Sequence, residues 1–217
     1  MDLVVFDCDG VLVDSETLAG EALRALHRSH GIEVSAELFS TVVGMKAADG
    51  LAALARATGR TLPPGADAEL WPATAALFRE RLRASDGVVG LLEASPLRRC
   101  VASSSHPERI ALSLEVTGLR RFFAEDAVFS AWEVRRGKPA PDLFLHASAR
   151  MGAEPARCVV IEDSRFGIEA AKAAGMLAVG YVGASHAGPE AAERLLHAGA
   201  DWVSNSMAEI GTRLKTL

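Results

Sequence analysis

The chain has 217 residues, a formal net charge of −5 at pH 7, and hydrophobic and charged contents of 49% and 24%. This composition is ordinary for a globular protein, and the length suits one domain or a domain that carries an insertion. The acidic balance and the lack of any run of five basic residues argue against a nucleic-acid partner. An anionic small molecule is not excluded, because a local lysine or metal ion can outweigh the overall charge.

Three cysteines, Cys8, Cys100 and Cys158, lie in or beside apolar, strand-like runs, so we expect reduced thiols in the core. The chain opens without a basic segment and apolar core, and no uninterrupted apolar stretch reaches membrane-spanning length. We therefore expect a cytoplasmic protein with no membrane partner.

The opening run Leu3-Val4-Val5-Phe6 is apolar without alternation, which predicts a strand buried on both faces. Asp7-Cys8-Asp9-Gly10 follows, and Gly10 permits a tight turn that would bring Asp9 over the same pocket as Asp7. Two carboxylates this close are costly unless a cation neutralises them, and Mg²⁺ is the simplest candidate. Two solvated acids at a strand end remain the alternative at this point.

Segment 11–15 is predicted to be a short extended connection that ends in Ser15, a candidate helix N-cap. Apolar residues at helical spacing then predict four helices and no strand in residues 16–82. The predicted helices cover 16–30, 35–44, 47–58 and 66–82, the last with a kink near Pro72. This segment is therefore expected to form a helical unit inserted after the first strand.

Helices and strands alternate in the rest of the chain. Strands are predicted at 99–102, 127–130, 158–161, 177–182 and 201–203, and helices at 88–94, 107–116, 141–151, 166–174 and 189–198. This alternation predicts an α/β fold with a Rossmann-like, mostly parallel sheet covered by helices on both faces, plus the inserted all-α unit.

Polar residues fall at the carboxyl ends of these strands, where a parallel sheet forms its binding crevice. The set is Asp7, Asp9, Ser103, Glu162 and Asp163, joined by Lys138 from the loop Arg136-Gly137-Lys138-Pro139. Each has a plain structural explanation alone: a strand-end turn for Ser103, a solvated lysine for Lys138, and a helix-dipole pair for Glu162-Asp163. Together they predict one crevice with four acids, a hydroxyl and a cation.

Four short motifs occur in order along the chain: DCDGVLVD, ASSS, RGKPAPD and VIEDSRFG. They resemble the four motifs of the haloacid dehalogenase superfamily, in the branch of phosphatases and phosphomutases with a small helical cap after the first motif. The resemblance covers almost the whole chain, although each motif alone is of weak or moderate specificity. It implies a Rossmann-like core domain of residues 1–15 and 83–217 and a helical cap domain of residues 16–82.

The resemblance also implies a Mg²⁺-dependent phosphatase that forms an aspartyl phosphate, and the requirements of phosphoryl transfer agree with it. Asp7 is the expected nucleophile. Asp9 is the expected acid and base, because the leaving oxygen needs a proton and a water must then be activated.

The expected metal ligands are the Asp7 carboxylate, the Asp9 backbone carbonyl and Asp163, with Glu162 in or next to the coordination shell. Phosphate oxygens are expected to be held by Ser103, Ser104 and Lys138.

Asp9 also favours a phosphatase over a dehalogenase, because a halide leaving group needs no proton and the dehalogenases that resemble this fold lack this acid. Ala19 and Ala47 stand where β-phosphoglucomutase carries a histidine and a phosphate-gripping arginine. A sugar phosphomutase is therefore the disfavoured alternative. The motif context looks more like phosphatases of sugar phosphates and sugar-acid phosphates.

The loop Gly44-Met45-Lys46 resembles the family's substrate-specificity loop, so Met45 and Lys46 are expected to contact an anionic or hydroxylated substrate. A solvated loop lysine is the alternative for Lys46. His106 follows the serine motif and either contacts substrate or begins a helix.

The expected partner is a small phosphorylated metabolite, and the chain is expected to act as a monomer. A retained fold that serves as a non-enzymatic binding module is a further alternative. Such a protein would be expected to lose the nucleophile, the lysine or a metal-binding acid, and all of them are present here.

Overall fold

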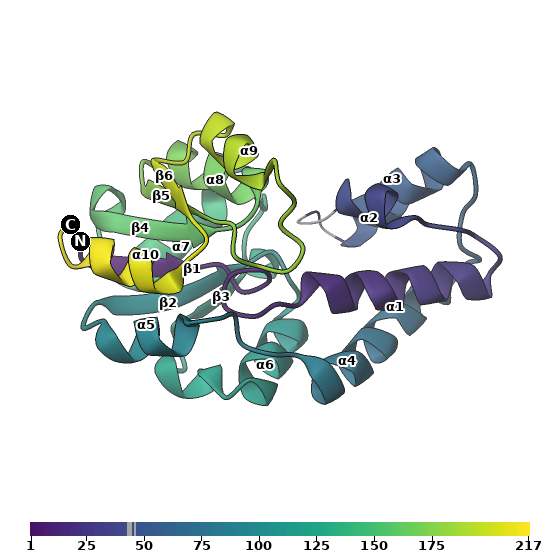
Figure 1. Ribbon diagram of the computed structural model, residues 1–217, viewed down its shortest axis with the longest axis horizontal. Helices are drawn as coiled ribbons and strands as arrows, with labels where there is room; N and C mark the ends of the chain where they lie inside the picture. The colour runs from purple at the N-terminus through teal and green to yellow at the C-terminus, as the bar shows by residue number, and fades with distance from the viewer. Residues whose placement is uncertain (43–44, 46) are drawn as a thin grey trace.

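The computed structural model describes residues 1–42, 45 and 47–217, and its central element is a six-stranded parallel sheet (Figure 1). The strands are β1 (Leu3–Phe6), β2 (Arg98–Ser103), β3 (Val128–Ser130), β4 (Cys158–Glu162), β5 (Leu177–Tyr181) and β6 (Trp202–Ser204). Their order is β3-β2-β1-β4-β5-β6, so β2 and β3 extend the sheet on one side of β1, and β4, β5 and β6 extend it on the other. The predicted α/β architecture is confirmed, and its topological switch point lies between β1 and β4.

Side chains that alternate along β1 enter two different cores. Val4 and Phe6 pack with helices α5 (Val88–Ala94), α6 (Pro107–Val116) and α10 (Met207–Leu214). Leu3 and Val5 pack with α7 (Asp142–Arg150), α8 (Arg165–Ala173) and α9 (Ala191–His197). Each such buried side chain contributes roughly 1.5–3 kcal/mol. The sheet is therefore covered on both faces, which explains the unbroken apolar run in the sequence.

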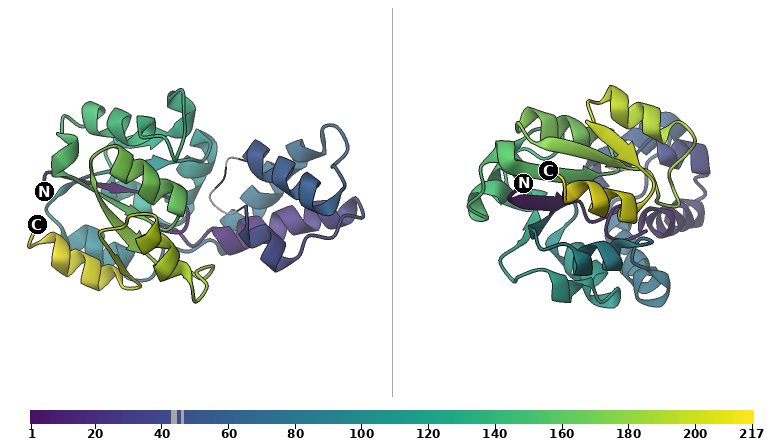
Figure 2. Two further views of the ribbon diagram at one scale, coloured as in Figure 1. Left: turned by 90° about the horizontal axis from the view of Figure 1, so that it is seen from above. Right: turned by 60° about the vertical axis from the view of Figure 1, so that its left-hand side comes forward.

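A separate group of helices follows β1 and lies at one end of the molecule, while both chain termini lie at the other (Figures 1 and 2). It consists of α1 (Glu16–Ser29), α2 (Ala36–Ser40), α3 (Ala47–Thr58), a 3₁₀ turn η1 (Ala66–Glu69) and α4 (Leu70–Arg81). Its own small core includes Leu23, Ile32, Val34, Val42 and Leu54. Helix α4 packs on α1 and also on α6 of the sheet-containing part.

Helix boundaries differ from the sequence-based expectation in two places. The break in segment 66–82 falls between Glu69 and Leu70, before Pro72. Pro72 is the third residue of α4, in the first turn, where a missing N–H costs no helical hydrogen bond. The predicted second helix ends earlier, at Ser40, and the remainder of that prediction reaches residues 43 and 44, outside the described residues.

Helix α10 follows β6, although no element is predicted after residue 203. Its buried residues Met207, Ile210 and Leu214 recur at intervals of three and four. The Ser206 hydroxyl accepts the Glu209 N–H at 3.3 Å and caps the helix. Three shorter 3₁₀ turns are η2 (Leu119–Phe122), η3 (Ala131–Glu133) and η4 (Pro155–Arg157). Among the described residues, no helix is both long and apolar enough to cross a membrane.

Candidate active site

Lys138 joins the carboxyl ends of three neighbouring strands. Its Nζ lies 2.5 Å from Asp7 Oδ1, 2.5 Å from Glu162 Oε1 and 3.0 Å from the carbonyl oxygen of Ala102. Asp7 is fixed beside β4, because its N–H donates to the Ile161 carbonyl at 3.0 Å. The side chains of Lys138, Asp7 and Glu162 are only 3%, 9% and 1% exposed. The structure thus brings together three residues that lie 131 and 24 positions apart in sequence.

Glu162 is held from its other side by the start of α8. Its Oε2 accepts hydrogen bonds from the Ser164 N–H at 3.0 Å and hydroxyl at 2.9 Å. A Cβ at Gly167 would lie only 1.8 Å from the Glu162 carboxyl carbon, so glycine allows the helix to approach this closely. Both oxygens of Glu162 therefore have protein partners, one of them Lys138.

A tight turn carries the chain from Asp7 past Asp9. Gly10 has φ +78°, and the N–H groups of Leu12 and Val13 both donate to the Cys8 carbonyl. Residues 11 and 12 therefore lie in a turn, where the predicted extended conformation is wrong, whereas Val13 forms β-bridges with Asp9 and Ala84. The three residues are fully buried, and this burial accounts for their apolar character without a strand.

Four donor atoms surround the Asp9 carboxylate. Oδ1 accepts from the Ser15 hydroxyl at 2.6 Å and from Arg109 Nε and Nη2 at 3.0 and 2.7 Å. Oδ2 accepts from the Ser105 hydroxyl at 2.6 Å. Ser15 occupies the N-cap position of α1, but its hydroxyl caps no helical N–H, so the predicted capping role is wrong. The stronger acceptor is the carboxylate of Asp9.

Asp163 lies against the Asp7–Gly10 turn and is paired with His186. Asp163 Oδ2 is 3.0 Å from His186 Nε2, and a Cβ at Gly10 would lie 1.9 Å from that same oxygen. Burial raises the pKa of Asp163; the hydrogen bond from His186 opposes this and Glu162 adds to it. Glycine is therefore required at position 10 for two reasons: it adopts the positive φ of the turn, and it leaves room for the Asp163 carboxylate.

Asp7 and Asp163 are buried acids with too few cations, whereas at Asp9 the effect of burial is outweighed by Arg109 and by the Ser105 and Ser15 hydroxyls, which lower its pKa. Burial raises the pKa of Asp7, Lys138 opposes this, and Glu162, Asp163 and Asp9 reinforce it. Burial also favours the neutral form of Lys138, but Asp7 and Glu162 outweigh it and raise the lysine pKa. The site would therefore accept a further cation.

The donor set suits a small, hard cation. Among the described residues, no group of three or more His, Cys, Asp and Glu side chains is arranged to hold a metal ion. Mg²⁺ commonly takes only one or two protein carboxylates and completes its shell with water and substrate phosphate. Asp7 and Asp163, with the backbone carbonyl of Asp9, fit that smaller requirement, and the charge of Asp163 adds to the rise in the pKa of Asp7.

The other residues that were predicted to bind phosphate or substrate differ in how far they are buried. Ser103 is buried at the end of β2, and its Oγ accepts the Ser105 N–H at 3.1 Å; Ser104 is half-buried beside it. His106 is the N-cap residue of α6, with Nδ1 accepting the Glu108 N–H, and its ring packs edge-on to Trp132 at 4.9 Å. Met45 packs on the helical unit's core. Lys46 lies outside the described residues.

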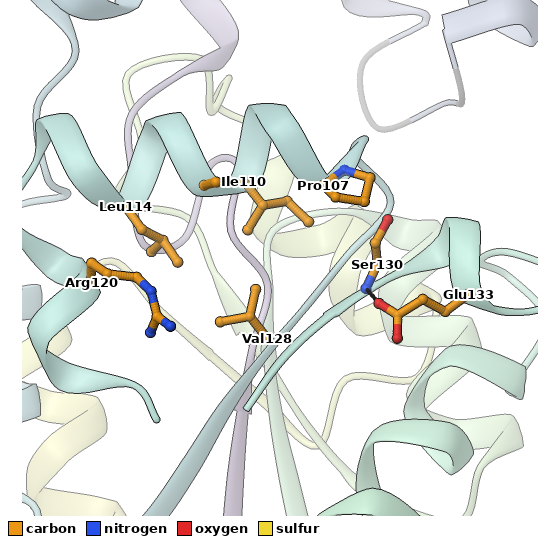
Figure 3. Close-up of a pocket in the computed structure, with 8 residues that line it drawn as sticks. Pro107, Ile110, Leu114, Arg120, Val128, Ser130 and Glu133 are labelled. Atoms are coloured by element: carbon orange, nitrogen blue, oxygen red, sulfur yellow. Dashed lines mark hydrogen bonds between the residues drawn. The ribbon is translucent and has the colours of Figure 1, made fainter. Parts of the chain in front are cut away.

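A cavity of about 170 Å³ lies beside these residues rather than on them (Figure 3). The side chains of Ile110, Leu114 and Val128 border it between α6 and β3, and Ser130 and Glu133 lie at one end. It includes none of the predicted catalytic or metal-binding residues. Its described lining is mainly apolar, with Arg120, Ser130 and Glu133 as the polar members, and it holds no carboxylate–lysine cluster like that around Asp7, so the polar crevice is the candidate active site.

Five described residues of the crevice were not assigned a catalytic or binding role from the sequence: Ser15, which was expected only to cap a helix, and Glu16, Ser105, Arg109 and His186. Ser105 belongs to the ASSS motif and could have been found there. Glu16, Arg109 and His186 come from three separate segments. No local pattern marks them, because the packing of α1, α6 and the loop after β5 brings them to the acids.

A sequence model of haloacid dehalogenase-like hydrolases matches residues 1–175. A 6-phosphogluconate phosphatase of Escherichia coli is 30% identical over 178 residues, 81% of this chain and 80% of that protein. A phosphorylated carbohydrates phosphatase of Thermotoga maritima is 33% identical over 180 residues, 81% of this chain and 82% of that protein. The solved structure of a haloacid dehalogenase-like protein of unknown function from Agrobacterium tumefaciens has a TM-score of 0.88 at 35% identity, covering 100% and 98% of the two chains. With a family match over most of its length and the acids and lysine of the motifs gathered at one sheet edge, this chain belongs to the haloacid dehalogenase-like hydrolases.

Proposed function

We propose that this chain is a Mg²⁺-dependent phosphatase that hydrolyses small phosphate esters, most readily sugar or sugar-acid phosphates, through an aspartyl phosphate on Asp7. One observation carries the proposal: two buried carboxylates, Asp7 and Asp9, follow β1, with Lys138 Nζ 2.5 Å from Asp7. The names of the two phosphatase relatives support the substrate class.

In the first half-reaction, a carboxylate oxygen of Asp7 attacks phosphorus and the bond to the ester oxygen breaks. Asp9 donates a proton to that leaving oxygen. Lys138, Ser103 and Ser104 bind the non-bridging phosphate oxygens, where negative charge must be stabilised.

In the second half-reaction, Asp9 takes a proton from a water molecule, whose oxygen attacks the phosphorus of the aspartyl phosphate. The bond to Asp7 breaks, and inorganic phosphate leaves. Mg²⁺, held by Asp7, Asp163 and the Asp9 carbonyl, would neutralise charge between nucleophile and phosphate. Glu162, with both oxygens engaged by Lys138 and Ser164, serves in this proposal to orient the lysine.

Residues 16–82 are proposed to act as a cap over a core of residues 1–15 and 83–217. Short connections near Ser15 and Arg83 would allow closure, which excludes bulk water from the crevice. Met45, Lys46 and His106 are proposed to contact the non-phosphate part of the substrate. The absence of a bound nucleic acid partner, the monomeric state and the cytoplasmic location stay predictions.

The test of the proposal is release of inorganic phosphate. Hexose phosphates and sugar-acid phosphates are expected to yield phosphate in a 1:1 ratio to the dephosphorylated sugar, measured by a phosphate assay and by chromatography. Ala19 has no imidazole and Ala47 has no cationic group to bind a second phosphate, so no phosphoryl transfer to a second hydroxyl is expected. Conversion of β-glucose 1-phosphate to glucose 6-phosphate without phosphate release would replace this proposal by a mutase. Inertness toward every ester, generic aryl phosphates included, would favour a binding module.

Chelation of divalent cations is expected to silence the enzyme, and added Mg²⁺ to restore it. Calcium should substitute poorly, because its larger and looser coordination shell misplaces the nucleophile. Binding can be followed without turnover, since Mg²⁺ at about 100 times its dissociation constant should stabilise the fold by about 2.7 kcal/mol in a thermal melt. Full activity in excess EDTA would contradict the metal requirement.

A further inference from the structure

The guanidinium group of Arg109 binds one oxygen of Asp9 through two of its nitrogens. Nε and Nη2 lie 3.0 and 2.7 Å from Oδ1, and the arginine side chain is only 22% exposed. Ser15 donates to the same oxygen. Three donors saturate Oδ1, whereas Oδ2 accepts, among the described residues, only from Ser105 and keeps acceptor capacity. The arrangement therefore selects Oδ2 as the oxygen of Asp9 that can exchange a proton with a substrate or a water.

Arg109 also contacts two helices of the helical unit of residues 16–82. Arg109 Nη2 lies 3.6 Å from Glu16 Oε1, at the first residue of α1. The guanidinium carbon lies 5.2 Å from the ring centroid of Phe78, in α4. Arg109 itself belongs to α6, which packs directly on α4. One buried cation thus lies between the acid of the crevice and two helices of that unit.

We propose that Arg109 is a positioning residue that turns the Asp9 carboxylate so that Oδ2 faces the ester oxygen of the substrate. This inference rests on the proposed role of Asp9 as general acid. Both guanidinium nitrogens bind the same oxygen, so Arg109 anchors Oδ1 and leaves Oδ2 for the substrate, whereas a lysine ammonium lacks the planar pair of N–H groups that makes this double contact. With the hydrogen bonds from Ser15 and Ser105 alone, each oxygen of Asp9 would accept one described donor, and nothing would distinguish Oδ1 from Oδ2 in acceptor capacity.

The experiment separates positioning from a general structural role by varying the leaving group. Values of kcat/KM are measured for p-nitrophenyl phosphate, whose leaving group needs no proton, and for a hexose phosphate, whose leaving alkoxide does. This parameter reports steps up to formation of the phosphoenzyme, so slower hydrolysis of that intermediate does not obscure it. The variants are Arg109→Lys, Arg109→Ala and, as reference, Asp9→Asn. Arg121→Ala is the matched control, because the Arg121 side chain is 63% exposed and, among the ion pairs and cation–π contacts of the described residues, contacts only Glu93, at 3.7 Å, and the ring of its neighbour Phe122.

Arg109→Lys and Arg109→Ala are expected to lose about a hundredfold in kcat/KM for the hexose phosphate, the usual worth of general acid catalysis, and less than about fivefold for the aryl ester. Guanidinium ion at millimolar concentration should restore much of the loss in Arg109→Ala, and ammonium should not. Arg121→Ala should match the wild type with both esters. Each variant is checked by thermal melting, and rescue by guanidinium keeps the result interpretable if one variant is less stable.

Equal losses with both esters, without guanidinium rescue, would overturn the positioning role. A rise in KM confined to sugar-acid phosphates, with kcat unchanged, would also overturn it and make Arg109 a substrate contact. If Asp9→Asn itself shows no selectivity between the two esters, then the acid role of Asp9 fails and the proposed mechanism with it. If Asp9→Asn is selective and the Arg109 variants are not, only the inference about Arg109 fails.

Discussion

Asp7→Asn is expected to lower turnover of any phosphate ester by about a thousandfold or more, because the amide oxygen is too weak a nucleophile to attack phosphorus. The fold should survive. Asparagine keeps the shape of aspartate, can still accept from Lys138, and removes one of the buried charges whose ionisation the site resists. Turnover is measured with a hexose phosphate and with an aryl phosphate, and folding by circular dichroism and thermal melting.

The nucleophile can also be identified without steady-state kinetics. Rapid acid quench of the wild type with substrate should yield a peptide that contains Asp7 and carries one phosphoryl group, and the variant should yield none. Asp2→Asn is a suitable control, since Asp2 lies just before the same strand but is exposed and paired with Arg157. Activity of Asp7→Asn within tenfold of the wild type, or phosphorylation at another residue, would contradict the assignment.

The parts of the fold that could be predicted are those in which a local pattern and the tertiary environment agree. Leu3 to Phe6 form an apolar run because both faces of β1 are covered, so the run alone identified a central strand. Val11 and Leu12 misled the prediction for the same reason. Both residues are buried in a turn, and burial without periodicity does not distinguish a turn from a strand.

The residues of the candidate site also fall into two groups, those that a local sequence pattern predicts and those that only the packing of elements places. Asp7, Lys138 and Glu162 follow from the rule that polar residues at the carboxyl ends of parallel strands share a crevice. Arg109 does not, because its place depends on the position of α6 against α4 and on which side of that helix faces Asp9. His186 likewise depends on the path of the loop after β5. Such residues are set by packing between elements, which no single stretch of sequence encodes.

Lys138→Met is expected to reduce both activity and stability, because this lysine is the buried partner of two acids. Turnover should fall by about a thousandfold, through loss of a charge at the phosphate oxygens and of the contact that orients Asp7. The free energy of unfolding should fall by about 3–5 kcal/mol, since Asp7 and Glu162 would remain buried without a cation. Arg136→Met is the matched control: it removes a cation two residues away whose pair with Asp142 is largely exposed on the arginine side, worth about 0–1 kcal/mol.

A second substitution tests whether uncompensated acids cause the loss of stability. Glu162→Gln in the Lys138→Met background removes one of the two buried charges and keeps a side chain that can still bond to Ser164. The double variant should therefore be more stable to urea than Lys138→Met alone, while its activity stays as low, because the charge that binds phosphate is still missing. A double variant no more stable than the single one would show that the lysine stabilises the site by other contacts, for example the cation–π contact of its Nζ with the ring of Phe144 at 5.0 Å, rather than by neutralising the two acids.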